Sequence, residues 1–260
     1  MGDETLGWDR DGAVVRITLD RPDAANGLDD VLAAELAAAA ARCDQDASVR
    51  AVVLTGSGRF FSAGGDLRAM GHRDGPVSGF VKGIADDLHR AMSTFARMSA
   101  PLVVAVNGVA AGAGFSLAVS GDLVLAASSA SFTMAYTRAG LSPDGGATYL
   151  LPRLIGLRRT QELILTNRTL SADEAAAWGL VTRVVPDEEL AGAATELAGQ
   201  LAAGSAGAHA TVKRLLLTSF GNGPEEQMEL EGRGIAACAG SPDGQEGIRA
   251  FLEKRRPEFA

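Results

Sequence analysis

The chain has few of the residues from which metal and redox sites are built. Its 260 residues include 2 cysteines and 3 histidines. Cys43 and Cys238 lie far apart and fit no metal or redox spacing, so we expect both to be small apolar residues in a reducing compartment. His72, His89 and His209 show no ligand spacing either. The sequence therefore argues against a catalytic metal site.

Basic character, aromatic residues and long apolar runs are also scarce. The net charge is −8, whereas a nucleic-acid-binding protein normally carries a basic face. No uncharged apolar run reaches the roughly 18 residues of a membrane span. Charged residues within positions 1–20 argue against a signal peptide. We therefore expect a cytoplasmic protein without nucleic-acid or membrane partners.

What the chain does contain is a repeated pattern of strand, small-residue turn and helix start. Residues 51–56 and 102–106 are apolar runs, and each leads through a turn rich in alanine and glycine toward a helix, at Leu67 and near Ala113. Small side chains allow close approach to the backbone, and a helix start presents unpaired N–H groups. Two such turns facing one point would form a two-donor pocket for an oxygen that gains negative charge.

The rest of the pattern predicts an α/β fold. Strands alternate with helices up to about residue 185, and the remainder is helical. The expected strands cover residues 14–19, 51–55, 102–106, 123–126, 131–133 and 181–185. The expected helices cover residues 31–43, 77–98, 146–154, 157–165, 172–177, 187–201, 208–220, 224–238 and 242–253. The recurring strand, turn and helix unit indicates repeating layers rather than a simple doubly wound sheet.

One nucleophile motif is nearly present. Residues 114–118 differ little from a nucleophile elbow, and Asp144 and His209 follow Ser116 in the order found in hydrolases. An elbow needs its strand to end directly before the serine, whereas here the strand ends several residues before Gly114. We therefore expect Ser116 to be a small residue that faces a pocket.

Several blocks of the sequence, taken in order, resemble one family. FSAGGDL at 61–67 and VNGVAAGAG at 106–114 resemble the two signature blocks of the crotonase superfamily, the enoyl-CoA hydratase/isomerase family. Further similar blocks lie at 140–146, 151–153, 170–175, 178–181 and 246–255. The resemblance implies a crotonase-like spiral of ββα repeats over residues 1–200 and a helical oligomerisation region over 201–260. It also implies a homotrimer or a dimer of trimers, and coenzyme A thioesters as substrates without any further cofactor.

The resemblance assigns residues to the site. The N–H groups of Gly65 and Ala113 match the donors that polarise the thioester carbonyl, which makes the two-donor pocket an oxyanion hole. Phe251 and Lys254 match C-terminal positions that help to close the site, often from a neighbouring subunit. Residues that match the stretch lining the adenine and pantetheine are Ser62, Ala63, Asp66, Leu67 and Arg68. The region 69–87, which has no motif of its own, is expected to shape the acyl pocket.

The reaction depends on acids that are partly missing. Hydratases of this family use two glutamates, and the matching positions here are Ser116 and Tyr136, which the resemblance places beside the substrate. Neither can replace a carboxylate, since serine does not titrate and tyrosine titrates near 10. Asp144 matches the catalytic aspartate of some isomerases and of a dehalogenase. The resemblance therefore favours Δ3–Δ2 enoyl-CoA isomerisation with Asp144 as acid and base, although an aspartate before Gly145 and Gly146 can also be a helix cap.

Three alternatives stay open. Hydration through a reorganised site is one, and a non-catalytic acyl-CoA binder that lost both glutamates is another. The third is dehalogenase-like hydrolysis, since Asp144 and His89 match the nucleophile and the histidine of 4-chlorobenzoyl-CoA dehalogenase. In that enzyme a tryptophan stands where this chain has Tyr136. For His89 itself, on an expected helix, we expect a surface or packing role.

Overall fold

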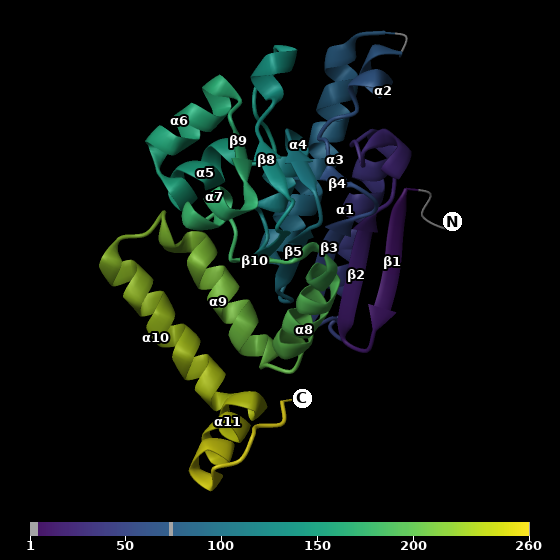
Figure 1. Ribbon diagram of the computed structural model, residues 1–260. Helices are drawn as coiled ribbons and strands as arrows, with labels where there is room; N and C mark the ends of the chain where they lie inside the picture. The colour runs from purple at the N-terminus through teal and green to yellow at the C-terminus, as the bar shows by residue number, and fades with distance from the viewer. Residues whose placement is uncertain (1–4, 73–74, 260) are drawn as a thin grey trace.

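The computed structural model describes residues 5–72 and 75–259, which form two sheets (Figure 1). The larger sheet has the strand order β1-β2-β3-β5-β7-β10, and the smaller has the order β4-β6-β8-β9. The larger sheet consists of β1 (Leu6–Asp11), β2 (Val14–Leu19), β3 (Ala51–Gly56), β5 (Leu102–Val106), β7 (Leu123–Ala127) and β10 (Arg183–Val185). The smaller consists of β4 (Phe60–Ser62), β6 (Val109–Ala111), β8 (Ser131–Thr133) and β9 (Thr169–Ser171). Positions 73 and 74 of the predicted acyl-pocket region lie outside the described residues.

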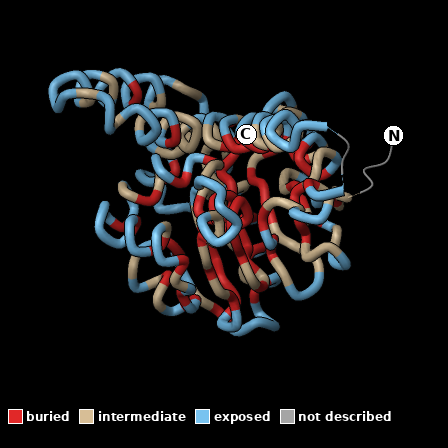
Figure 2. The backbone as a smooth tube through the Cα atoms, turned by 90° about the horizontal axis from the view of Figure 1, so that it is seen from above, coloured by how far each residue is buried: buried red, intermediate tan, exposed pale blue. Residues whose placement is uncertain are grey.

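The predicted repeat of strands and helices is confirmed. Three strands of the larger sheet, β3, β5 and β7, are parallel, and each leads into a short strand of the smaller sheet. Those short strands, β4, β6 and β8, are parallel as well. Every residue of β5 is buried, as expected of a strand covered on both faces. Figure 2 shows the buried residues gathered in the centre of the molecule, around these strands.

The helices begin and end within a few residues of their predicted limits. The first, α1 (Asp30–Gln45), starts at Asp29, whose carboxylate accepts the Leu32 N–H as predicted for a cap. It packs against α3 (Val77–Arg97) on the outside of the sheet. The other helices before residue 186 are α2 (Leu67–Gly71), α4 (Ala113–Ala118), α5 (Ala147–Ile155), α6 (Leu157–Thr166) and α7 (Ala172–Ala177). Short 3-10 turns occur at Pro22–Ala24, Tyr136–Ala139 and Asp187–Glu189.

The C-terminal helices lie progressively farther from the core. The first, α8 (Leu190–Ala202), packs on β3, β5 and β7, and α9 (Ala206–Ser219) contacts α3. Beyond them, α10 (Pro224–Gly240) and α11 (Pro242–Glu253) extend away from both sheets (Figure 1). Large apolar side chains on α9, α10 and α11 are exposed: Val212, Leu216, Phe220, Met228, Ile235, Ile248, Phe251 and Leu252. No helix within residues 5–72 and 75–259 is both long and apolar enough to cross a membrane.

A buried lysine ties α9 to the core. The side chain of Lys213 is 7% exposed, and its Nζ lies 2.6 Å from a carboxylate oxygen of Asp122. The same ammonium donates to the carbonyl oxygens of Phe95 at 2.9 Å and Ala100 at 3.0 Å. Asp122 also accepts the Leu102 N–H, at the start of β5. One charged group therefore joins α9, the end of α3 and the central strand.

Replacing Lys213 with methionine is expected to reduce the free energy of unfolding by about 3 kcal/mol, because Asp122 and two carbonyls lose their donor. This value lies at the low end for a broken buried pair, since Asp122 is partly exposed. Urea denaturation measures the loss. Adding Asp122→Asn to Lys213→Met is expected to cost less than the sum of the two single variants, and strict additivity would contradict the proposed coupling.

Candidate functional site

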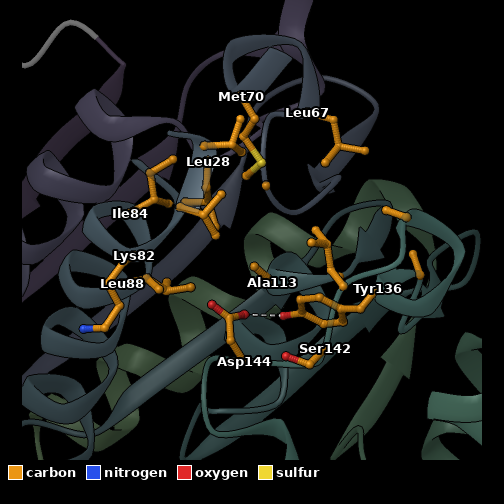
Figure 3. A pocket seen from close by; sticks show the side chains of 18 of the residues that line it. Leu28, Leu67, Met70, Lys82, Ile84, Leu88, Ala113, Tyr136, Ser142 and Asp144 are labelled. Atoms are coloured by element: carbon orange, nitrogen blue, oxygen red, sulfur yellow. Dashed lines mark hydrogen bonds between the residues drawn. The ribbon is translucent and has the colours of Figure 1, made fainter. Parts of the chain in front are cut away.

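A cavity of about 570 Å³ opens between α3, the turn before α2 and the loops that follow β6 and β8. Its wall is largely apolar, and Leu28, Met70, Ile84 and Leu88 lie across from Tyr136 and Asp144 in Figure 3. The lining residues are Leu28, Ala63, Gly65, Leu67, Met70, Val77, Ser78, Val81, Lys82, Ile84, Ala85, Leu88, Gly112, Ala113, Ala135, Tyr136, Ala139, Leu141, Ser142 and Asp144.

The two small-residue turns meet at this cavity. A Cβ built on Gly64, where φ is +88°, would lie 2.6 Å from the Ala111 carbonyl oxygen and 3.0 Å from the Ala113 nitrogen. A Cβ on Gly114 would lie 2.3 Å from the Ser62 carbonyl oxygen. The separations of 2.6 Å and 2.3 Å are shorter than real Cβ atoms make, so only glycine permits the two turns to approach this closely. The expectation that the turns face one point is confirmed.

Two backbone donors are available where the turns meet. Ala113 is the first residue of α4, so its N–H has no acceptor within the helix. Within the described part of the chain, neither the Ala113 N–H nor the Gly65 N–H has a hydrogen-bond partner. Both residues line the cavity. The arrangement therefore offers two N–H groups, one of them at the positive end of a helix, to an oxygen placed between them.

Asp144 lies on the loop between the Tyr136–Ala139 turn and α5. One carboxylate oxygen, Oδ1, accepts the Tyr136 hydroxyl at 2.6 Å, a pair drawn in Figure 3. Its side chain is 31% exposed and lines the cavity. The alternative role as a helix cap is wrong, because the N-cap of α5 is Gly146 and no side chain accepts a backbone N–H at this helix start. The carboxylate is thus free to act on a molecule in the cavity.

Ser116 lies beneath Tyr136 and Asp144 and does not reach the cavity surface. It is fully buried on α4. Its Oγ lies 3.1 Å from the Tyr136 hydroxyl and donates to the Asp144 carbonyl oxygen at 3.0 Å. The expectation that Ser116 faces the pocket is wrong in this structure, since Tyr136 and Asp144 cover it. The nearly complete hydrolase triad is also absent, because His209 lies at the start of α9, against Gly204.

Tyr136 is held in its protonated form. Burial raises the pKa of its phenol far above the ordinary value, and the negative charge of Asp144 raises it further. The protonated phenol therefore contributes stability below the ordinary pKa near 10, and that contribution is lost as the pH rises through the folded-state value.

A tyrosinate titration tests this state, because the chain has 2 tyrosines. In a Tyr149→Phe background, all phenolate absorption belongs to Tyr136. We expect this absorption to be absent up to about pH 11 and to appear only as the far-ultraviolet circular dichroism is lost. Ionisation near pH 10 with the fold intact would contradict the buried hydrogen bond.

His89 on α3 approaches the same loop. Its Nε2 accepts the Gly145 N–H at 3.0 Å and lies 3.6 Å from Oδ2 of Asp144. Its side chain is 47% exposed. The expected surface or packing role is therefore incomplete, because the ring fixes the backbone directly after Asp144. In the neutral ring this hydrogen bond places the proton on Nδ1.

Of the five residues expected around the adenine and pantetheine, Ala63 and Leu67 line the cavity. Ser62 does not, because it is fully buried, donates to the Asn26 carbonyl oxygen and accepts the Gly64 N–H. Asp66 caps α2, and its carboxylate lies 3.1 Å from Arg21. Burial acts to raise the pKa of Asp66, but hydrogen bonds from the Ala69 N–H and Arg21 hold it below its ordinary value.

The side chains of Ser62 and Asp66 therefore maintain the turn and do not line the cavity, and their predicted contacts with the ligand stay predictions. Arg68 is exposed on the first turn of α2, outside the residues that line the cavity. Its predicted contact with the ligand stays a prediction.

Phe251 and Lys254 are not part of the cavity of their own chain. Phe251 is 82% exposed on α11, and Lys254 ends that helix in a left-handed conformation. Figure 1 places α11 at the opposite end of the molecule from α2. A contact between these residues and a ligand therefore requires another copy of the chain.

One wall of the cavity comes from α3, within and directly after the region 69–87 that was expected to shape an acyl pocket. Val77, Val81, Ile84 and Leu88 line it from α3 at spacings of three and four residues, as one face of a helix does. This periodicity is visible in the sequence, and three of the four residues, Val77, Val81 and Ile84, fall within that region. Leu28 and Met70 carry no comparable signal.

Comparisons with known proteins give a consistent picture. Residues 9–260 match the family described as enoyl-CoA hydratase/isomerase. The chain is 40% identical over 248 residues to 1,2-epoxyphenylacetyl-CoA isomerase of Escherichia coli K12, covering 95% of this chain and 94% of that protein. It is 38% identical to a probable enoyl-CoA hydratase of Rhodobacter capsulatus, with 100% and 99% coverage. A solved enoyl-CoA hydratase subunit of Geobacillus kaustophilus superposes with a TM-score of 0.90 at 37% identity, with 98% of each chain covered.

Proposed function

The chain belongs to the enoyl-CoA hydratase/isomerase family, and we propose that within it the protein moves a carbon–carbon double bond of an acyl-CoA from Δ3 to Δ2. The observation that supports this proposal most strongly is the number of carboxylates in the cavity. Among the described residues that line it, Asp144 is the one carboxylate. One carboxylate is enough to remove a proton and return it elsewhere, whereas the two-glutamate hydration expected of the family needs a second.

The proposed reaction proceeds in two proton transfers. The thioester oxygen binds between the N–H groups of Gly65 and Ala113. Asp144 removes a proton from C2, and the electron pair passes into a dienolate whose oxygen the two donors stabilise. The protonated Asp144 then returns the proton to C4, which leaves the double bond conjugated with the thioester. No water enters the product, and the enzyme regains its starting protonation state.

Two further features support this proposal. The relative at 40% identity carries the name of an isomerase that acts on a coenzyme A ester. The apolar wall formed by Leu28, Met70 and α3 also suits a hydrocarbon acyl group and limits the access of water. Other relatives are named as hydratases or as carnitinyl-CoA dehydratase, so hydration is the activity to measure beside isomerisation.

The experiment incubates the purified protein with 3-hexenoyl-CoA and follows the near-ultraviolet absorption of the conjugated thioester. We expect conversion to 2-hexenoyl-CoA, and with substrate deuterated at C2 we expect part of the label at C4. Parallel incubation with 2-hexenoyl-CoA measures hydration through loss of the same absorption. Hydration faster than isomerisation would overturn the proposal in favour of a hydratase, and binding of both thioesters without turnover would indicate a non-catalytic binder.

Dehalogenase-like hydrolysis receives less support from the geometry. That reaction needs a histidine to activate water beside the aspartate. The Nε2 lone pair of His89 already accepts the Gly145 N–H, so it is not free to take a proton from water. Absence of solvent oxygen in Asp144 after a single turnover with an aryl halide thioester would exclude this chemistry.

We also propose that the protein assembles as a homotrimer or a dimer of trimers. The exposed apolar side chains of α9–α11 support this, since Leu216, Phe220, Ile235 and Phe251 gain burial only against another surface. Assembly would also allow Phe251 and Lys254 to reach a neighbouring site. Light scattering gives the mass of the assembly, and a monomer at micromolar concentration would contradict the proposal.

A further inference from the structure

Two hydrogen bonds from neighbouring segments hold Asp144 in place. Its Oδ1 lies 2.6 Å from the Tyr136 hydroxyl, and its main-chain oxygen lies 3.0 Å from Ser116 Oγ. Tyr136 and Ser116 are themselves 3.1 Å apart. The three residues come from the turn after β8, from α4 and from the loop before α5, so the contact joins three separate segments.

The number of protons on each group determines which group donates in each hydrogen bond. Ser116 has one hydroxyl proton, which its bond to the Asp144 carbonyl oxygen uses, because a carbonyl can only accept. Tyr136 also has one proton, and the ionised carboxylate of Asp144 is its strongest acceptor at this short distance. Oδ1 of Asp144 is therefore occupied. Oδ2 lies 3.6 Å from His89 Nε2, beyond hydrogen-bond distance, and keeps its lone pairs.

We propose that Tyr136 is a positioning residue that reserves Oδ2 of Asp144 for the substrate, with Ser116 fixing the main chain of Asp144. This inference rests on the isomerisation proposed above. Oδ2 then performs both steps: its bond to hydrogen forms as the C2–H bond breaks, and that bond breaks as the C4–H bond forms. The electron pair moves to the thioester oxygen in the first step and returns in the second.

The backbone around the pair has little freedom to adopt another arrangement. Ala135, directly before Tyr136, has φ +51°, a conformation that costs a residue with a Cβ about 1 kcal/mol or more. Gly145 and Gly146, directly after Asp144, also have positive φ. A Cβ on Gly145 would lie 2.8 Å from the Cβ of Ser116, so the loop is seated closely on α4. Such packing preorganises the carboxylate before the substrate arrives.

Tyr136 does not itself serve as the acid or base. Burial and the charge of Asp144 raise the pKa of its phenol far above neutral pH, so it does not release its proton during turnover. A hydroxyl that keeps its proton is suited to a permanent hydrogen bond. The role assigned to Tyr136 is therefore to hold the oxygen that is not reacting.

The test is the Tyr136→Phe variant, with Tyr149→Phe as the matched control. Loss of a hydrogen bond to a carboxylate is expected to lower kcat for 3-hexenoyl-CoA by about 10- to 100-fold, with KM within about twofold of wild type. The acid limb of the kcat/KM profile is expected to move to higher pH, because the carboxylate loses a donor that stabilises its charge. When the substrate carries deuterium at C2, less of this deuterium is expected at C4 in the variant than in wild type, since either carboxylate oxygen can now take the proton. Tyr149→Phe is expected to match wild type in its kinetic constants, its pH profile and its label transfer.

A kcat and a pH profile equal to wild type in Tyr136→Phe would overturn the inference. If Asp144→Asn also keeps its isomerase activity, the proposed function fails as well; if that variant is inactive, only the role of Tyr136 fails. Should Tyr136→Phe not fold, a measurement without substrate replaces it. In the Tyr149→Phe background, Asp144→Asn is expected to lower the pH at which Tyr136 ionises. An unchanged titration would show that the two groups are not paired and would overturn the inference.

Discussion

Replacing Asp144 with asparagine is expected to lower kcat/KM for Δ3–Δ2 isomerisation by about 10³-fold or more. Asparagine keeps the size of the side chain and an oxygen that can accept the Tyr136 hydroxyl at the Oδ1 position. What it loses is the ability to take a proton from carbon. The variant therefore separates the chemistry from the geometry, and the substrate should still bind.

Two measurements make this expectation decisive. The first is the rate with 3-hexenoyl-CoA, compared with Asp11→Asn, which makes the same chemical change on the exposed end of β1. The second is the dissociation constant for the conjugated thioester, which should stay within about threefold of wild type. An Asp144→Asn protein that turns over at more than a tenth of the wild-type rate would mean that another group is the base.

Replacing Ala113 with proline is expected to lower kcat by about 10²–10³-fold without unfolding the protein. Proline removes one backbone N–H and leaves the other donor, Gly65, unchanged. Ala113 is the first residue of α4, a position at which proline is tolerated because its N–H has no partner in the helix. Gly112 before it has φ +52° and ψ −125°, outside the α region that a following proline disfavours.

The control is Ala206→Pro, the same substitution at the first position of α9, whose preceding residue Ser205 is extended. It should retain full activity and a similar melting temperature. A smaller rate loss than tenfold in a folded Ala113→Pro protein would indicate that the thioester oxygen does not lie between the two turns. Thermal denaturation of both variants shows whether any loss comes from misfolding.

The parts of the fold that could be predicted are those specified by local sequence. The long strands other than β1 and the long helices follow from periodicity, capping and glycine or proline placement, as at Asp29 before α1. The strands that escaped prediction are β1 and three short strands of the smaller sheet, β4, β6 and β9, whereas β8 lies at the expected residues 131–133. A strand as short as β9 contains no complete period, and its existence depends on pairing with β8 far away in the sequence.

The substrate class could be predicted from the sequence, but the contacts between the side chains of the site could not. The small-residue turns predicted a pocket with two backbone donors, and the family resemblance assigned these donors to Gly65 and Ala113. Ser62 and Asp66 lie in the same block, yet they turn inward to support the turn, and sequence spacing does not distinguish these two directions. The bond between Tyr136 and Asp144 joins two residues of unremarkable spacing, which only the conformation of the loop brings together.

The proposed oxyanion donors and the carboxylate belong to separate segments. Gly65 and Ala113 lie on two turns that glycines hold in close contact, whereas Asp144 lies on the loop that leads to α5. A substitution in that loop can change which group faces the cavity without moving the two backbone donors. New acids, bases or nucleophiles introduced between Met134 and Gly146 would therefore lie beside the same two backbone donors.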